Sequence, residues 1–175
     1  MKETNRKRTT LWLCVTAMLM ALNVVMSSFS VPVPGGHLYM NDVVICTAAI
    51  VLDPLAAFMV GGVGAFLGDL LFYPTPMFVS LVTHGLQAVV ISVFSCYVMK
   101  KHPAVASGIG VAIGAVIMVV GYSLGRAFLY STPEYALVKL PFQILQATVG
   151  AVAGMILAWK CGIRRLIGSL RLYPQ

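Results

Sequence analysis

Charged side chains are scarce in this sequence, and their scarcity excludes most soluble folds. Lys and Arg supply 12 of the 175 residues and Asp and Glu supply 5, so charged residues make up 10% of the chain. A soluble globular domain usually carries about 25%. Hydrophobic residues make up 59%, and the mean hydropathy is +0.92. These values indicate an integral membrane protein with one transmembrane domain over residues 1–175.

Metal sites and ATP hydrolysis lack the sequence patterns they need. No GxxxxGK[ST] sequence is present, so we expect no P-loop ATPase, and HExxH is also missing. The cysteines form no CxxC pair, so neither a metal site nor a disulfide is expected; they are Cys14, Cys46, Cys96 and Cys161. We therefore predict no metal ligands, no catalytic residues and no cofactor in this chain.

Apolar segments of the length needed to enter a membrane fill most of the chain. A span needs about 20 residues, and the predicted spans are 11–31, 42–52, 55–72, 77–99, 104–130 and 134–159. Pro54 separates the second from the third because it disfavours helix at Asp53, which is expected to cap the next helix. The expected fold is an all-α membrane protein, a six-helix transmembrane bundle.

Basic residues predict the orientation of this bundle. They form three clusters: Lys2, Arg6, Lys7 and Arg8; Lys100, Lys101 and His102; Lys160, Arg164, Arg165 and Arg171. Loops 32–40, 73–76 and 131–133 contain no Lys or Arg. Because basic loops stay in the cytoplasm, segments 42–52 and 55–72 must together cross twice or enter and return. Both termini are then cytoplasmic.

Polar side chains of the spans gather near the outer side. The inner segments 88–99, 105–118 and 147–159 contain no charged residue. This one-sided pattern favours a cup that captures a solute from outside, since a channel needs polar groups at both depths. The expected solute-binding residues are His84, Gln87, Tyr122, Arg126, Lys139, Gln143 and Gln146. The expected lid residues are His37, Tyr39 and Asn41.

Each of these polar residues also has a purely structural interpretation. Arg126 and Lys139 can extend to the lipid headgroups, His84 can be a packing residue, and the glutamines can bond neighbouring helices. Small residues at four-residue spacing leave a similar choice between packing within the chain and docking to a partner. The pairs are Ala17/Ala21, Gly61/Ala65, Gly64/Gly68, Gly110/Gly114, Gly121/Gly125 and Gly150/Gly154.

Several motifs, in their order along the chain, resemble the substrate-binding S component of energy-coupling factor (ECF) vitamin transporters. Residues 17–21 (AMLMA) resemble the AxxxA motif of the first span in that family. The other matching segments are 36–45 (GHLYMNDVVI), 52–55 (LDPL), 61–70 (GGVGAFLGDL), 121–130 (GYSLGRAFLY) and 140–151 (LPFQILQATVGA).

The resemblance implies a protein of the prokaryotic cell membrane that captures a small vitamin beneath its first outer loop. It implies partners: a transmembrane T component, which Ala17 and Ala21 would contact, and two cytoplasmic ATPases that use ATP. The protein would topple in the membrane to release its solute.

The branch that this chain most resembles handles hydroxymethylpyrimidine or pyridoxine-like vitamins. That branch often has an acidic residue at the position of Arg126. Arg126 and Lys139 favour a carboxylate or another anion, so pantothenate and niacin remain open. Other classes also remain: a stand-alone small-solute channel or exporter, an intramembrane enzyme with His84 within hydrogen-bond reach of an exposed Ser or Asp, and a structural membrane subunit without a cavity.

Overall fold

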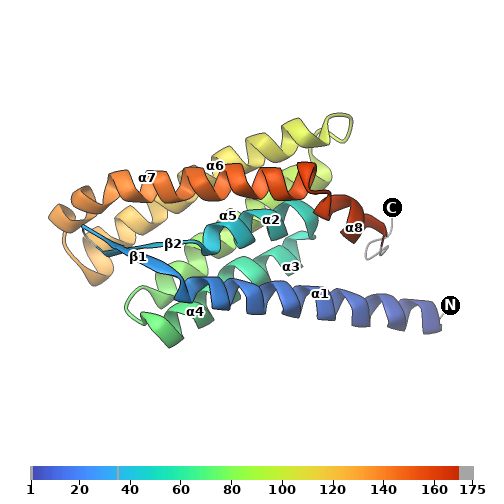
Figure 1. Cartoon of the computed structure of the whole chain (residues 1–175), viewed down its shortest axis with the longest axis horizontal. Coiled ribbons are helices and arrows are strands. Elements are labelled where there is room, and N and C mark those ends of the chain that lie inside the picture. The colour runs from blue at the N-terminus through green and yellow to red at the C-terminus, as the bar shows by residue number, and fades with distance from the viewer. Residues whose placement is uncertain (1, 35, 170–175) are drawn as a thin grey trace.

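The fold is a bundle of long helices with one short hairpin at its end (Figure 1). A computed structural model describes residues 2–34 and 36–169. Its helices are α1 (Lys2–Ser28), α2 (Asn41–Val51), α3 (Pro54–Phe58), α4 (Gly64–Phe72), α5 (Met77–Tyr97), α6 (Pro103–Gly125), α7 (Pro133–Met155) and α8 (Ile163–Ser169). Wider π-helical turns continue three of them: η1 (Met59–Val63), η2 (Arg126–Tyr130) and η3 (Ile156–Lys160). The strands are β1 (Ser30–Val33) and β2 (Gly36–Tyr39).

Among the described residues, five helical segments are long and apolar enough to cross a membrane. They are Arg8–Ser28, Pro54–Phe72, Met77–Tyr97, Pro103–Tyr130 and Pro133–Lys160. Each corresponds to a predicted span. The remaining predicted span, 42–52, is represented by α2, which has 11 residues. At a rise of about 1.5 Å per residue it covers roughly half of a bilayer core.

The described chain is mostly helical, as the predicted all-α fold requires, but the segment that follows α1 contains a short hairpin. Helix α1 ends at Ser28 rather than at residue 31, because Ser30–Val33 pairs antiparallel with Gly36–Tyr39. Gly36 has a φ of +143°, a backbone conformation that favours glycine. The chain after residue 160 also departs from the expected tail, since Ile163–Ser169 forms the short helix α8.

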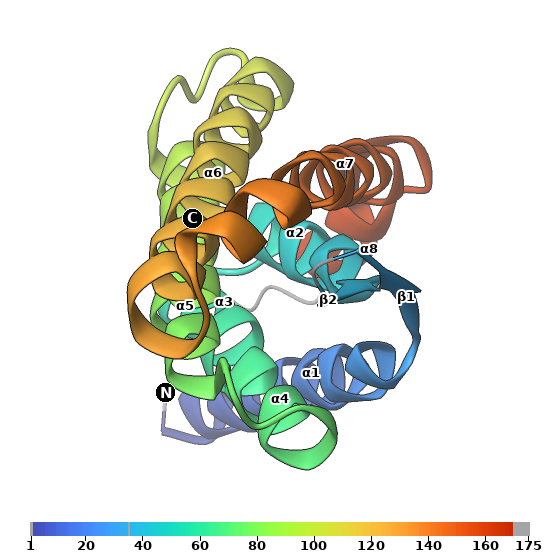
Figure 2. The ribbon, with the colours of Figure 1, turned by 90° about the vertical axis from the view of Figure 1, so that its left-hand side faces the viewer.

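Helix α2 lies at the centre of the bundle. Viewed along the bundle, it is enclosed by α1, α5 and α7 (Figure 2). The close approach of α7 depends on two glycines. A Cβ on Gly150 would lie 2.5 Å from the Cβ of Asp42, and one on Gly154 would lie 2.6 Å from the Cβ of Cys46. Any side chain at these positions would push α7 away from α2.

The small-residue pairs divide into two groups. The glycines pack within the chain; for example, a Cβ on Gly68 would lie 2.5 Å from Ser27 Oγ, and one on Gly121 would lie 2.6 Å from Thr83 Oγ1. The side chains of Ala17 and Ala21 are instead exposed on α1. This pair therefore leaves a shallow outward surface that nothing in the described chain covers.

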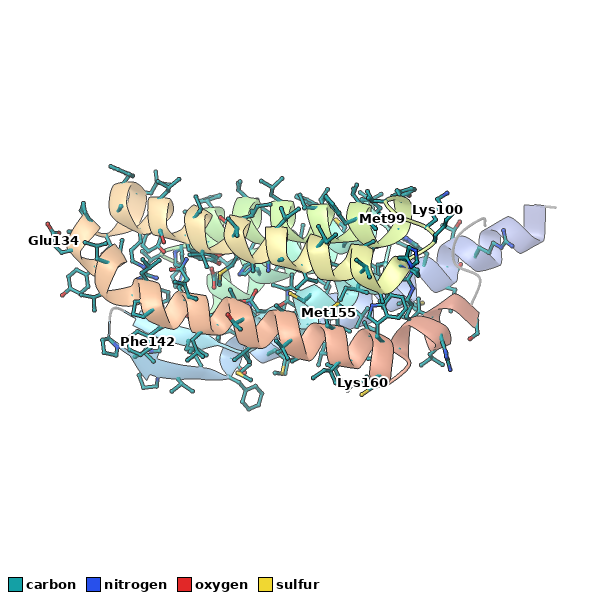
Figure 3. All side chains as sticks on the ribbon, turned by 90° about the horizontal axis from the view of Figure 1, so that it is seen from above. Met99, Lys100, Glu134, Phe142, Met155 and Lys160 are labelled. Atoms are coloured by element: carbon teal, nitrogen blue, oxygen red, sulfur yellow. The ribbon has the colours of Figure 1, made fainter. Side chains whose placement is uncertain are left out.

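The two ends of the bundle differ in character. Lys100 and Lys160 lie at one end with α8 and the start of α1, and Glu134 lies at the opposite end (Figures 1 and 3). We call these the basic end and the hairpin end. At the basic end the Trp12 indole donates to Asp53 Oδ1 at 2.7 Å. Asp53 occupies the N-cap position of α3, as predicted, although its side chain makes no helix-capping hydrogen bond.

Candidate functional site

A cavity of about 30 Å³ lies beneath the hairpin, among α2, α4, α5, α6, η2 and α7. It is lined by His37, Tyr39, Asn41, Asp69, His84, Met118, Tyr122, Arg126, Lys139, Gln143 and Gln146. The structure thus brings together all three predicted lid residues and six of the seven predicted solute-binding residues. The exception is Gln87, which lies behind the cavity wall. The helical spacing explains this convergence, because residues three, four or seven apart share one helix face.

Asp42 organises the deep wall of the site from the first turn of α2. Its side chain is buried, with 1% of its surface exposed. Gln146 Nε2 donates to its Oδ2 at 2.6 Å, and Gln87 Nε2 approaches its Oδ1 at 3.3 Å. The other end of the Gln87 amide, Oε1, lies 2.7 Å from His84 Nδ1. Gln87 therefore links the carboxylate of Asp42 to the imidazole of His84.

A second carboxylate, Asp69, supports the wall formed by α5 and α6. Ser80 Oγ donates to Asp69 Oδ2 and also shares a hydrogen bond with the Tyr122 hydroxyl. The Tyr122 ring meets the His84 ring edge-on, with centroids 5.2 Å apart. Asp69 is thus connected to the Tyr122 ring through Ser80, and Asp42 is connected to the His84 ring through Gln87.

Two cations lie at the side of the cavity that faces the hairpin. The Lys139 ammonium donates to the His37 carbonyl, and only 3% of the Lys139 surface is exposed. Within the described part of the chain, Lys139 has no ion-pair partner. Arg126 lies over the Tyr130 ring at 5.4 Å, and its Nη1 lies 3.4 Å from the Cβ position of Gly36. Both cations therefore contact or approach the backbone of the hairpin.

The hairpin is attached to α7 through its main chain. Besides the bond from Lys139 to the His37 carbonyl, the Tyr39 N–H donates to Gln146 Oε1 at 3.1 Å. The His37 ring packs near Tyr73, with centroids 6.0 Å apart. Burial raises the pKa of the Tyr39 phenol above its ordinary value, so this hydroxyl stays protonated near neutral pH.

Sequence reasoning missed four residues of the site: Asp69 and Met118, which line the cavity, and Asp42 and Ser80, which orient other residues. The two carboxylates carry a usable signal, because each is an acidic residue in a predicted span or at its outer end. Met118 is apolar, so nothing in the pattern separates it from lipid-facing residues.

One enzyme motif occurs in the chain, at residues 121–125, where GYSLG fits the serine-hydrolase pattern GxSxG. In hydrolases that serine occupies a sharp turn between a strand and a helix. Ser123 instead lies within α6, and its hydroxyl is buried without a hydrogen-bond partner in the described chain. The motif therefore forms no nucleophile elbow. His84 Nδ1 lies 2.7 Å from Gln87 Oε1 and 3.7 Å from Asp42 Oδ1. Asp42 is buried, so the described residues do not pair His84 with an exposed Ser or Asp, as the enzyme hypothesis requires.

Comparison with known proteins identifies the family. A family model described as "ECF-type riboflavin transporter, S component" matches residues 7–162. The chain belongs to this S component family. It is therefore a membrane transport protein and not an enzyme. An uncharacterized protein of Pyrococcus woesei is 29% identical over 136 residues, which cover 77% of this S component and 89% of that protein.

Proposed function

We propose that this chain is the substrate-specific S component of an ECF-type ABC importer and captures a small water-soluble vitamin or precursor at the extracellular face. The observation that carries the proposal is a buried polar cavity closed by the hairpin, at the end of the bundle opposite Lys100 and Lys160. Basic residues mark the cytoplasmic side, so the hairpin end faces outward. Both termini are then cytoplasmic, and α2 counts as the sixth, partial span.

The charges of the site support an anionic or strongly polarised solute. Lys139 is buried and has no carboxylate partner in the described chain. A buried charge without a partner is costly, by several kcal/mol in typical cases. A carboxylate, phosphate or carbonyl group of the solute would offset that cost by accepting hydrogen bonds from Lys139 and Arg126.

The size of the cavity implies that the site opens to admit its solute. Sites for small organic ligands usually measure about 300–1,000 Å³, an order of magnitude more than the 30 Å³ found here. The hairpin is the movable wall, because few side chains attach it to the bundle. Hydroxymethylpyrimidine and pyridoxine are the leading candidates by sequence resemblance. Riboflavin, after which the family model is named, pantothenate and niacin are the alternatives.

The energy for import comes from partner subunits in this proposal. The exposed Ala17 and Ala21 on α1 form a flat surface on which a helix of a transmembrane T component can pack closely. Two cytoplasmic ATPases complete the importer and use the ATP. A stand-alone channel or exporter is less well supported, because the segments on the basic side of the cavity contain no charged residue. These segments are 88–99, 105–118 and 147–159.

Mass spectrometry of small molecules that co-purify with the full chain tests this function. We expect a vitamin or vitamin precursor at close to one molecule per chain, lost in the Arg126→Ala variant.

A transport assay of the purified chain alone in liposomes separates the alternatives. Solute flux without partner subunits would contradict the S component assignment and support a channel or exporter.

A further inference from the structure

We propose that the cavity is polarised in its hydrogen bonding, with acceptors on its deep wall and donors beside the hairpin. The solute would accordingly carry N–H or O–H groups at its deep end and an oxygen or nitrogen atom that accepts hydrogen bonds at its other end. This inference rests on the proposed function, since it describes the solute of the same site. The donor and the acceptor in each buried hydrogen bond can be assigned, and this assignment determines which atoms remain available to a solute.

The orientation of Tyr122 follows from the single proton of Ser80. As a carboxylate, Asp69 can only accept hydrogen bonds, and Ser80 donates its hydroxyl proton to it. Ser80 then has only lone pairs to offer in its bond with the Tyr122 hydroxyl. Tyr122 must therefore donate to Ser80. Its phenol oxygen, beside the cavity, is left with lone pairs alone.

The tautomer of His84 follows from Asp42 in the same way. Facing a carboxylate, the Gln87 amide must point its NH₂ group toward Asp42 and its carbonyl oxygen toward His84. The His84 Nδ1 must then carry a proton to donate to that oxygen. In the neutral imidazole the opposite nitrogen, Nε2, is an acceptor.

The Gln143 amide adds an acceptor to the same wall. Gln143 Nε2 lies 2.9 Å from the Val119 carbonyl and 3.4 Å from the Met118 carbonyl. Because backbone carbonyls only accept, the amide cannot be reversed, and Oε1 is the Gln143 atom left for a solute. Asn41 lines the cavity next to the hairpin, and its buried Oδ1 has no hydrogen-bond partner among the described residues. No bond fixes the orientation of this amide, so Asn41 is assigned to neither wall.

The opposite side of the cavity has the reverse character. Lys139 and Arg126 have only donors to offer, and both lie against the hairpin backbone. Along α6, Arg126 lies one helical turn closer to the hairpin end than Tyr122 does. Along α7, Lys139 lies one turn closer to that end than Gln143. The two walls are thus about 6 Å apart in depth, a separation that a six-membered ring with two substituents spans.

Nitrogen NMR of the full chain labelled with ¹⁵N-histidine tests the proton arrangement without any ligand. The chain has 3 histidines, so the His84→Gln variant identifies the His84 signals. We expect the neutral tautomer protonated at Nδ1. The Asp42→Asn variant, which removes the carboxylate that orients Gln87, should shift His84 toward a mixture of tautomers. A His84 protonated at Nε2, or at both nitrogens, would overturn the proposal.

A matched pair of probes tests the acceptor wall by binding. The first probe is 4-amino-5-hydroxymethyl-2-methylpyrimidine, and in the second a methyl group replaces the amino group. We expect the amino probe to bind at least about tenfold more tightly, because loss of a donor leaves a buried acceptor unpaired. Equal affinity for the two probes would overturn the proposal. If neither probe binds while the NMR result is as expected, the failure lies with the proposed vitamin and not with the polarity of the site.

Discussion

Lys139 shows how a single residue connects the stability of this protein to its function. It is buried at 3% exposure, and its described contact is a backbone carbonyl rather than a carboxylate. Such an arrangement destabilises the folded chain, since the desolvation of the charge is not offset by an ion pair. A residue that lowers stability in this way is best explained by a ligand that pairs with it.

Replacement of Lys139 by methionine separates these two effects. Lys139→Met keeps most of the side-chain volume and removes the buried charge. We expect the melting temperature to equal or exceed that of the wild type, and binding of an anionic solute to weaken by at least about thirtyfold, or about 2 kcal/mol. Thermal unfolding in detergent and equilibrium binding measure the two quantities. A clear fall in melting temperature would show that Lys139 stabilises the fold.

Arg126 and Gln143 are predicted to contact the solute from different helices. Arg126→Ala and Gln143→Ala should each weaken binding by about tenfold or more, because each removes a hydrogen bond in a buried site. The matched control is Leu137→Ala on α7. The Leu137 side chain is 69% exposed and does not line the cavity. Affinity that is unchanged in both site variants would contradict this assignment of the cavity.

Among the structural elements, the hairpin and the short helix α8 are the ones that sequence patterns failed to predict. Residues 30–39 contain Pro32, Pro34 and two glycines, which are typical of turns, and the two strands have four residues each.

The helices were more predictable because apolar spans and four-residue spacing determine which side chains share a face. Tyr122 and Arg126 were placed together by this spacing. Asp42 was not assigned to the site, because contacts between helices, which spacing along one helix cannot predict, bring it to Gln146.

Gly36 provides a test of the hairpin as a functional lid. Gly36→Ala forces a side chain into a backbone conformation at φ +143° and places a Cβ 3.4 Å from Arg126 Nη1. Strain of this kind costs about 1–3 kcal/mol, and we expect affinity to fall at least about fivefold.

The matched control for this variant is Gly162→Ala. Gly162 also has a positive φ, +77°, but no atom of the described residues lies within 4 Å of its Cβ position, and it lies next to α8 at the basic end. This variant should cost similar stability without changing solute affinity. Equal loss of affinity in the two variants would mean that backbone strain anywhere weakens binding, and the lid role would be contradicted.

At the scale of the whole molecule, capture and energy coupling occupy different surfaces. The cavity lies inside the hairpin end, whereas Ala17 and Ala21 face outward on α1. Tight glycine contacts hold the other helices together, so the bundle is suited to move as one body. In the importer that we propose, such a body would bind its solute without its partners and would need them only for delivery.

Tryptophan on the α1 surface should separate these two activities. Ala17→Trp and Ala21→Trp are expected to abolish uptake and co-purification with the T component, because a large side chain prevents close helix packing. Solute binding should stay within about twofold of the wild type. The control is Val116→Trp on α6, which is 61% exposed on a different helix. Assembly that survives both α1 substitutions would disprove the docking surface.

The attachment of the hairpin to α7 has a consequence for how cargo preference evolves. Lys139 and Gln146 hold the hairpin by the His37 carbonyl and the Tyr39 N–H, which every residue except proline can supply in the same way. These two bonds therefore do not depend on which side chains occupy positions 37 and 39. Substitutions at these positions would change the lining of the cavity, while the two α7 side chains would continue to hold the hairpin.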